Sequence, residues 1–481
     1  MVALSANAGI SCAFALCLAG CIVHDVDRMP TAATESPNRF ASELQPTPSG
    51  DEREVGVWWD ELGDDSLSGL IDEALTSNLT AADFAARVLA ARSIARQAGA
   101  ERLPALDATG SAGFRSANED GVGEAIEGLD FAGDIGVVVS WEADVFGRLR
   151  SREQAAVLDA VAARDDLDAV LLAVSADIAR EYYRATEQRL LLELLQQQID
   201  RDDTLLELIE LRFAQGDANG LDLLRQRAQL AEAQALIPPA RAALRTAENA
   251  LDALTGTPAD GVDRVSAVFP SIPDIPAAGV PADLLVNRPD IRAAQRRLVA
   301  IDFRIGEAIA DRLPRFNIVG SLAYADTPEG AGFAASVLAG VFAPLLDWGR
   351  REAVVDERRA EYASLLAGYT SLYVDAIAEV DTLLYGEQRT REQVEVLTKR
   401  VDLLDRAVVE ARNRYVNGIG DYTDVLVALD DLQETQRELL AAEALLVQQR
   451  IEVYRAVGGS IGTDVIPVDD LILEREQEAR S

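Results

Sequence analysis

The most constraining feature of this chain is that it repeats parts of its own sequence. The segment RFAQGDANGLDLLRQRAQLAEAQ at 212–234 returns as RYVNGIGDYTDVLVALDDLQETQ at 414–436, an offset of 202 residues. A second pair, LPALDATGSAGF at 103–114 and LPRFNIVGSLAY at 313–324, returns at an offset of 210. A repeated order of helix, strand, strand and helix limits the fold far more than composition does. The sequence therefore predicts one long architecture made of two similar halves.

The charge of the chain excludes one class of partner. Its 481 residues include 81 acidic and 45 basic side chains, giving a formal net charge of −36, and Lys399 is the single lysine. Nucleic acid binding needs a basic face, so we expect no nucleic acid partner. Two interpretations of the acidity stay open, because it can serve cation selectivity or can reflect the source organism.

The first 21 residues contain all the cysteines and resemble a bacterial lipoprotein signal. Cys12, Cys17 and Cys21 are the only cysteines, so the body of the chain can hold neither a disulfide nor a cysteine metal site. A short apolar run at 8–20 ends in Leu-Ala-Gly before Cys21, and no Lys or Arg precedes it. The resemblance implies cleavage after residue 20, a diacylglycerol on the Cys21 thiol and a fatty acyl chain such as palmitate on the new amino terminus. An ordinary cleaved signal with a chance cysteine is the alternative.

The residues around this signal indicate a destination and a tether. Ile22 follows the cysteine where Asp would suggest inner-membrane retention, which favours the outer membrane by analogy. Residues 21–57 are rich in Pro, Ser, Thr and acidic residues, and are typical of an extended tether. Folding is expected to begin near Trp58.

Hydrophobic periodicity predicts several long helices. A helical period runs from Ser66 to about Arg102, and a duplicate helix is expected to begin around Pro289. Residues 149–214 contain neither Pro nor Gly, which predicts a helix of about 100 Å at 1.5 Å per residue, and 350–416 is its counterpart. Gly216 and Gly418 are expected to turn the chain into return helices at 221–255 and 422–457. The Pro pair at 238–239 is expected to kink or restart the first of these.

Four segments alternate along the chain with a period of two, as β-strands do. They lie at 105–115, 131–142, 314–324 and 332–344, and the last is apolar on both faces. Polar residues on one face and apolar ones on the other are typical of transmembrane barrel strands, although a half-buried sheet in a soluble protein alternates in the same way. Four strands cannot close a barrel, so a membrane barrel would have to be shared by at least two protomers.

Several motifs in a fixed order resemble the TolC-like outer-membrane efflux factors, in particular the lipoprotein branch that serves RND-type multidrug pumps. They are WWDELGDDSLSGLIDEALTSN at 58–78, WEADVFGRLR at 141–150, NRPDIRAAQRRL at 287–298, APLLDWGRR at 343–351, both repeated helical turns, and IEVYRAVGG at 451–459. The resemblance implies an α+β membrane protein with long α-helical hairpins forming a periplasmic α-barrel. Its four strands per chain would join a homotrimer's 12-stranded transmembrane β-barrel. It further implies efflux repeats at 58–257 and 258–460, followed by a C-terminal tail at 461–481.

The same resemblance implies passive export. Substrate would arrive from an inner-membrane RND-type pump through a periplasmic adaptor and leave through the outer membrane, with no enzyme activity, no cofactor and no metal. His24, the only histidine, lies in the tether and is a poor candidate metal ligand. The exit duct of a type I protein secretion system remains an alternative. So does a lipid-anchored, non-conducting periplasmic coiled-coil scaffold.

The candidate site residues lie at the two repeated turns. By resemblance, three copies of Asp424 would form an acidic ring at the pore constriction, with Val427 as an apolar neighbour and Tyr415 as an aromatic latch. The alternatives are a solvated helix-start acid for Asp424 and an ordinary packing residue for Tyr415. The candidates for docking an adaptor are Gly216, Gly418, Arg212 and Arg414, unless the glycines only turn the chain and the arginines only pair with nearby acids. Arg148 and Arg350, near strand-to-helix junctions, are expected to be structural.

Overall fold

The structure, a computed structural model, describes residues 23–34, 37, 40–41, 57–116, 129–272, 283–327 and 330–460. The predicted signal peptide, Cys21, most of the tether and the tail at 461–481 lie outside these residues. The chain divides into two compact units. Unit 1 comprises 1–33, 87–164 and 293–370, and unit 2 comprises 34–86, 165–292 and 371–481. Each unit therefore draws on both halves of the sequence.

The long helices have the bounds that periodicity predicted, to within one or two residues. Helix α4 runs from Arg148 to Gln215 and α9 from Arg350 to Val416. The first return path is split into α5 (Gly220–Ala235) and α6 (Ile237–Leu254), with Pro238 and Pro239 in the first turn of α6, where missing N–H donors cost nothing. The second return path, which has no proline, is one helix, α10 (Tyr422–Ala456).

The prediction of a single helix from 66 to 102 is wrong. Two helices, α2 (Asp65–Ser77) and α3 (Leu79–Ala100), meet at Asn78, after a short 3-10 helix, η1 (Trp58–Leu62). The Asn78 side chain accepts hydrogen bonds from the N–H groups of Thr80 and Ala81, and its amide donates to the Leu254 carbonyl at 2.7 Å. A buried side chain that caps a new helix in this way ends the old one. The corresponding break in the second half separates α7 (Leu284–Asn287) from α8 (Pro289–Ala310). There the sequence indicated the helix start, because Pro289 suits the first helical turn.

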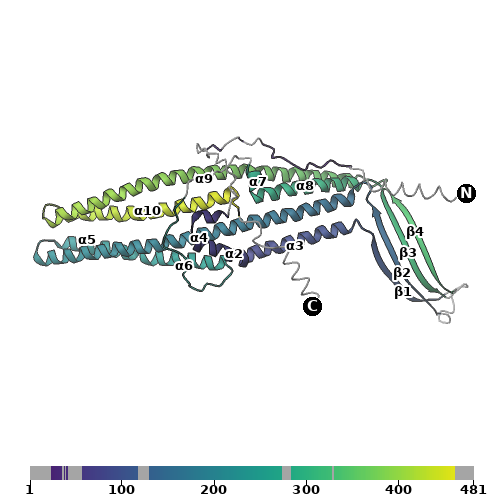
Figure 1. Ribbon diagram of the computed structural model, residues 1–481, viewed down its shortest axis with the longest axis horizontal. Coiled ribbons are helices and arrows are strands. Elements are labelled where there is room, and N and C mark those ends of the chain that lie inside the picture. Colours follow the sequence, from purple (N-terminus) through teal and green to yellow (C-terminus); the bar gives the residue numbers. More distant parts are fainter. Residues whose placement is uncertain are drawn as a thin grey trace. The chain divides into compact units, whose positions relative to one another are not determined.

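The strands form one antiparallel sheet in the order β1-β2-β3-β4, which Figure 1 shows side by side. Their bounds are β1 Ala105–Ser116, β2 Leu129–Ala143, β3 Arg315–Thr327 and β4 Gly330–Phe342. All four predicted strands are present, although β4 ends two residues earlier than expected. Within the described residues, one edge of β1 and one edge of β4 carry no paired strand.

The two faces of the sheet differ in polarity. Leu106 lies opposite Val139, Val137 opposite Leu322, and Ile135 opposite Tyr324, so these apolar side chains share one face, and all of them are exposed. The other face carries polar groups, including a hydrogen bond between the hydroxyls of Ser321 and Ser336 at 2.8 Å. A large exposed apolar face that is not covered by the chain's own helices marks an interaction surface.

Unit 2 is held together by aromatic packing and a buried ion pair. Trp58 stacks on Tyr454 with ring centroids 5.5 Å apart, and both are almost fully buried. Arg450 of α10 and Glu387 of α9 are both 0% exposed, and the guanidinium binds both carboxylate oxygens, at 3.1 and 2.5 Å. A pair this deeply buried leaves a strongly unfavourable charge behind when one partner is removed.

The described part of the tether contacts unit 1. The His24 ring lies 2.6 Å from the Asp302 carboxylate of α8, which also accepts a hydrogen bond from the N–H of Asp27 at 2.8 Å. Gln295 donates to the carbonyl of Pro30, and the Ala33 N–H donates to the Thr370 hydroxyl. None of the helices in the described ranges has the length and apolarity needed to cross a membrane.

Candidate functional site

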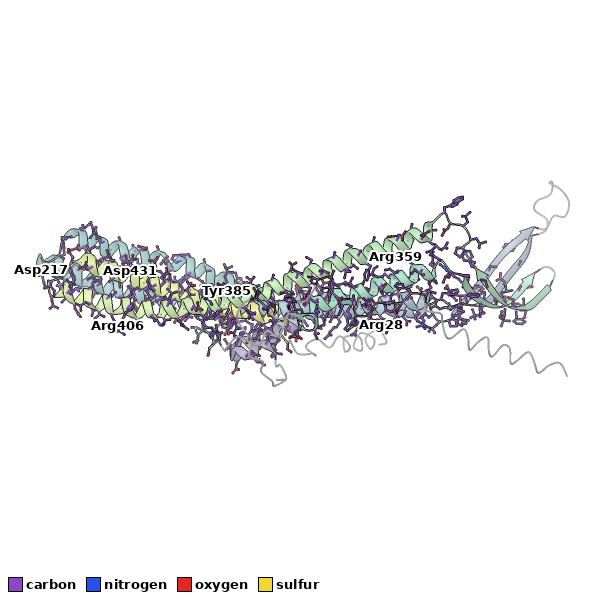
Figure 2. The ribbon with its side chains drawn as sticks, turned by 90° about the horizontal axis from the view of Figure 1, so that it is seen from above. Arg28, Asp217, Arg359, Tyr385, Arg406 and Asp431 are labelled. Atoms are coloured by element: carbon purple, nitrogen blue, oxygen red, sulfur yellow. The ribbon has the colours of Figure 1, made fainter. Side chains whose placement is uncertain are left out.

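Both repeated turns end their helices with the same backbone motif. Gly216 follows α4 with φ 85°, and Gly418 follows α9 with φ 73°, a left-handed conformation that glycine adopts without strain. The next N–H reaches back to the carbonyl of Arg212 in the first turn and of Arg414 in the second, at 2.9 and 3.0 Å. These contacts define the Schellman motif, so both glycines turn the chain as predicted. Asp217, labelled in Figure 2, marks the first turn.

The two arginines that the repeat aligns have different surroundings. Arg212 donates a hydrogen bond to the carbonyl of Tyr415 at 3.0 Å, and its guanidinium lies 4.5 Å from the centre of the Tyr415 ring. The Arg414 side chain is exposed and forms no hydrogen bond or ion pair among the described residues. Neither arginine pairs with an acid there. Arg212 therefore links α4 to the end of α9, whereas the Arg414 side chain is available to another molecule.

Tyr415 packs inside the chain. It is 5% exposed and belongs to a core cluster with Tyr422, Val425 and Leu429 of its own hairpin, and Leu205 and Ile209 of α4. Its ring lies 5.8 Å from that of Tyr422. This placement favours the packing alternative over a role at the surface of a pore.

Asp424 and Val427 both face outward. Asp424 lies in the first turn of α10 and is exposed, and no other described residue binds its carboxylate. Val427, three residues later and nearly one helical turn away, is 54% exposed. Asp424 thus occupies the helix position that the dipole favours for an acid, and it also remains open to neighbouring molecules.

A buried polar layer just inside these turns went unpredicted. The Tyr422 hydroxyl donates to the Gln226 side chain at 2.5 Å, and the Gln226 amide donates to the backbone carbonyl of Asp202 at 2.8 Å. The Gln433 amide in turn donates to the Asp202 carboxylate at 3.0 Å. Burial raises the pKa of Asp202, although the hydrogen bonds from Gln433 and Gln226 oppose this shift. The layer joins α4, α5 and α10, and only polar residues at helix positions with buried neighbours could have signalled it.

Gly420 is a further constraint that the sequence did not reveal. A Cβ atom built at Gly420 would lie 2.9 Å from the Cβ of Arg414 and 3.4 Å from the backbone nitrogen of Tyr415. At 2.9 Å the two Cβ atoms would be too close unless the backbone or the Arg414 side chain moved. Glycine at position 420 therefore lets the chain pass close to the end of α9.

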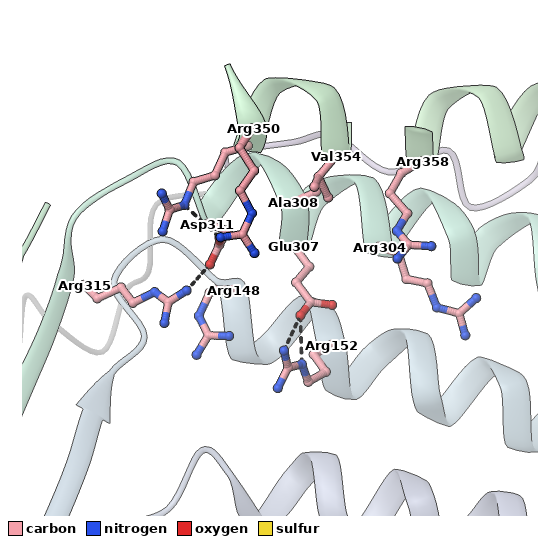
Figure 3. A pocket seen from close by; sticks show the side chains of 11 residues that line it. Arg148, Arg152, Arg304, Glu307, Ala308, Asp311, Arg315, Arg350, Val354 and Arg358 are labelled. Atoms are coloured by element: carbon pink, nitrogen blue, oxygen red, sulfur yellow. Dashed lines mark hydrogen bonds and ion pairs between the residues drawn. The ribbon is translucent and has the colours of Figure 1, made fainter. Parts of the chain in front are cut away.

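Unit 1 contains a cavity of about 790 Å³ beside the strand-to-helix junctions, shown in Figure 3. Its charged lining comes from α4, α8 and the turn that follows it, β3 and α9, and consists of Arg148, Arg152, Arg304, Arg315, Arg350, Arg351, Arg358, Glu307 and Asp311.

Acids compensate most of this positive charge. Arg148 forms two hydrogen bonds with Glu142, and Arg152 bridges Glu101 and Glu307. Asp311 pairs with both Arg315 and Arg351, and these contacts outweigh its burial and hold the pKa of its carboxyl below the ordinary value. Arg304 and Arg358 have acidic partners too. The prediction that Arg148 is structural is consistent with its pairing, whereas Arg350 has no ion pair among the residues with described placement. These ion pairs connect the helices and the strand at the junction, and they leave little uncompensated positive charge to bind an anion.

The remaining candidate residues are Cys21, which is predicted to carry lipid, and His24, a poor candidate metal ligand. Cys21 lies outside the described residues. Within those residues, no group of three or more His, Cys, Asp or Glu side chains could hold a metal ion, and His24 has Asp302 as its partner.

Comparisons with known proteins agree on one family. The family model described as "Outer membrane efflux protein" matches residues 70–257 and 280–459. The chain is 28% identical over 412 residues to the solvent efflux pump outer membrane protein SrpC of Pseudomonas putida, covering 82% of this chain and 86% of that protein. It is 28% identical over 447 residues to the pyoverdine export outer membrane protein OpmQ of Pseudomonas putida, covering 90% and 93%.

The fold comparison gives the same answer. The structure of the outer-membrane channel OprN matches with a TM-score of 0.80 at 25% identity, covering 90% of this chain and 99% of that one. The fold is thus that of the TolC-like channels, mostly helical with a four-stranded antiparallel sheet. With its helical hairpins, its exposed apolar sheet and a family model that matches most of its length, this chain belongs to the outer membrane efflux protein family.

Proposed function

We propose that this chain is the outer-membrane exit duct of a tripartite efflux system. Three copies would pool their strands in a 12-stranded barrel, and their helical hairpins would continue the channel into the periplasm. The observation that carries this proposal is the sheet of unit 1, which has one exposed apolar face, one more polar face and two edges without a paired strand in the described residues. Such edges cannot face lipid unpaired, because each free backbone group there costs several kcal/mol.

The helical turns would be the periplasmic end, where a periplasmic adaptor docks and an inner-membrane RND-type pump delivers substrate. The exposed Arg414 side chain and the backbone turns at Gly216 and Gly418 would provide the docking contacts. Arg212 would support them from within, through its contact with Tyr415. Exposed Asp424 carboxylates from three copies would form the acidic constriction, with Val427 beside them.

Lipidation of Cys21 would anchor the mature chain in the outer membrane. The intact mass of protein extracted from outer membranes should correspond to a chain that begins at Cys21 and carries acyl groups. An unmodified amino terminus at another residue would contradict this part of the proposal.

The two efflux repeats would span 58–257 and 258–460, and the two segments matched by the family model fall within these bounds. Solvents and pyoverdine are named for the relatives SrpC and OpmQ. Whichever substrate this duct carries would be selected by its pump.

The central experiment is reconstitution of the purified protein in planar lipid bilayers, together with its mass in detergent. A trimer that produces discrete single-channel currents is the expected result. A folded monomer without channel activity would favour the scaffold alternative. Alternatively, the trimer conducts while deletion of its gene blocks secretion of a protein substrate and leaves drug resistance unchanged. That result would favour the type I secretion duct.

A further inference from the structure

The tether and the arginine-lined cavity of unit 1 lie on opposite faces of α8. The tether contacts α8 at Asp302 and at Gly306, where an added Cβ atom would meet the His24 ring at 3.5 Å. Arg304 and Ala308 line the cavity, and each lies two residues after one of these tether contacts. At 3.6 residues per turn, a step of two residues rotates a side chain by about 200°, to the other side of the helix.

The tether determines which of these faces borders the proposed duct. Cys21, the predicted lipid-carrying residue, precedes His24 by three residues, so at most about 11 Å of chain separates them. A segment that starts in the lipid lies outside the channel wall, because so short a length of chain cannot pass through the wall. The tether face of α8 is then the outer face, and the opposite face, with the cavity, borders the lumen.

One arginine of the cavity lining stands out by its lack of compensation. Arg350 is exposed, and its side chain forms no ion pair within the described ranges. Every other arginine of the lining, shown in Figure 3, has an acidic partner. Several of those acids, such as Glu142 and Asp347, are not part of the lining. The uncompensated positive charge of this face is therefore that of Arg350.

The repeat explains why Arg350 has no partner. At the offset of 202 residues it corresponds to Arg148, whose guanidinium binds both carboxylate oxygens of Glu142, at 3.1 and 2.8 Å. The residue that corresponds to Glu142 is Pro344, which has no charge. The second half has thus kept the arginine and lacks its acid. A guanidinium without a carboxylate keeps its fork of N–H donors available to another anion.

We propose that Arg350 side chains from three copies form a positive ring at the neck of the duct, where the strands meet the helices, and that this ring binds anionic groups of passing solutes. Phosphates, sulfonates and carboxylates are the groups that such a ring attracts. The proposal rests on the duct function proposed above, and it adds the lumen-facing surface and a second charged station. This ring is opposite in sign to the acidic ring of Asp424.

Arg359 offers a matched control on the same helix. It lies nine residues after Arg350, about two and a half turns, and therefore on the opposite side of α9. It lies eleven residues, about three turns, before Thr370, whose hydroxyl accepts the tether N–H of Ala33. Its side chain, labelled in Figure 2, is exposed and lies 3.5 Å from Asp356. Arg359 is thus an exposed arginine on the tether face.

Block of single-channel currents by tripolyphosphate tests the charge of the ring. The anion is added in planar bilayers to the side that the barrel faces, so that it reaches the neck before the helical turns. Arg350→Gln should require several-fold more tripolyphosphate for half block, because three charges leave the ring. Arg350→Lys should retain most of the block, since it keeps the charge. Arg359→Gln should leave the block unchanged.

Restoring the missing acid provides a second test that leaves Arg350 in place. Pro344→Glu puts a carboxylate where the repeat has Glu142, so it should pair with Arg350 and weaken the block as Arg350→Gln does. Pro344→Gln removes the proline without adding charge, and should leave the block unchanged. This pair of variants separates the effect of the acid from that of losing the rigid proline backbone.

Cysteine labelling tests the face directly, because the chain has no cysteine after Cys21. In Arg350→Cys channels, a sulfonate-bearing thiosulfonate reagent should change the current, and an ammonium-bearing reagent should change tripolyphosphate block in the opposite direction. In Arg359→Cys channels, neither reagent should alter current or block.

The outcomes separate this inference from the function on which it rests. Unchanged block in Arg350→Gln channels would refute the positive ring. Equal effects of labelling at positions 350 and 359 would refute the assignment of the lumen face. In both cases the conducting duct would stand. If the unmodified protein forms no channels at all, the duct function itself is wrong.

Discussion

Arg212, near the end of α4, holds the end of α9 by donating to the carbonyl of Tyr415 at 3.0 Å while its guanidinium lies over the Tyr415 ring. A helix end leaves carbonyl groups without intrahelical partners, and a cation is a favoured group to satisfy them. The Tyr415 carbonyl accepts the Gly418 N–H at 3.1 Å as well. The arginine that the repeat places at the equivalent position, Arg414, makes no such contact within the described residues. The same residue type therefore stands at matching positions in the two halves but makes different contacts in each.

This asymmetry predicts different outcomes for Arg212→Ala and Arg414→Ala. Loss of the charged hydrogen bond of Arg212 should destabilise the paired turns by about 1–3 kcal/mol, which faster amide hydrogen exchange in 205–230 and 408–430 would report. Arg414→Ala should leave exchange unchanged and weaken adaptor binding. Equal effects of the two substitutions on exchange would show that the contact of Arg212 contributes little.

The close approach at Gly420 predicts a sharp difference between two glycine substitutions. In Gly420→Ala the new Cβ would lie 2.9 Å from that of Arg414, so the second turn must move. In Gly220→Ala, at the first turn, the nearest atom is a Phe213 ring carbon at 3.8 Å, an ordinary contact. Only Gly420→Ala should increase proteolytic cleavage near 414–424. Resistance equal to that of the unmodified protein would mean that the turn relaxes without cost.

The exposed position of Asp424 allows a test of the proposed constriction. Asp424→Ala and Asp424→Asn should lower cation preference and weaken block by multivalent cations in planar bilayers, since three like charges leave one ring. Val427→Asp adds three charges nearly one turn away and should strengthen both properties. An unchanged current–voltage relation and unchanged block in Asp424→Ala channels would identify Asp424 as a solvated helix-start acid.

The buried pair of Arg450 and Glu387 predicts a loss of stability that a double substitution restores. Arg450→Met alone should destabilise unit 2 by about 3–5 kcal/mol, because Glu387 would keep a buried charge with one weaker contact, from Arg391 at 3.2 Å. The double variant Arg450→Met/Glu387→Leu should recover most of the lost thermal midpoint, as apolar replacement of such a pair is often neutral. A double variant no more stable than the single one would indicate that the pair fixes the α9–α10 packing.

Asp202 predicts a pH-dependent gain in stability. Its folded-state pKa is raised by burial, so the folded chain holds this proton more tightly than the unfolded chain does. The resulting stability is present below the ordinary aspartate range near pH 4, and is lost as the pH rises through the folded value. Asp202→Asn keeps an oxygen for Gln433 and removes the charge, so it should raise the thermal midpoint at pH 7 and bring little change near pH 4. A variant that is less stable at pH 7 would show that Gln226 and Gln433 require the carboxylate.

The sequence by itself determined the repeated plan, the long helices, the strands and the turn glycines. These features arise from local physics. A stretch without Gly or Pro continues as a helix, strict alternation makes a two-faced strand, and glycine alone turns left-handed without strain. The bounds of α4, Arg148–Gln215, were predicted to within one residue for this reason.

Only the tertiary structure determined which residues at matching positions of the repeat make matching contacts. Asn78 ends α2 because its amide finds the Leu254 carbonyl, 176 residues away in sequence, and no local pattern encodes that meeting. The different contacts of Arg212 and Arg414, and the burial of Tyr415 between its own hairpin and α4, likewise depend on which helices pack side by side. Such contacts between distant segments are set by packing of the whole chain, whereas periodicity describes one segment at a time.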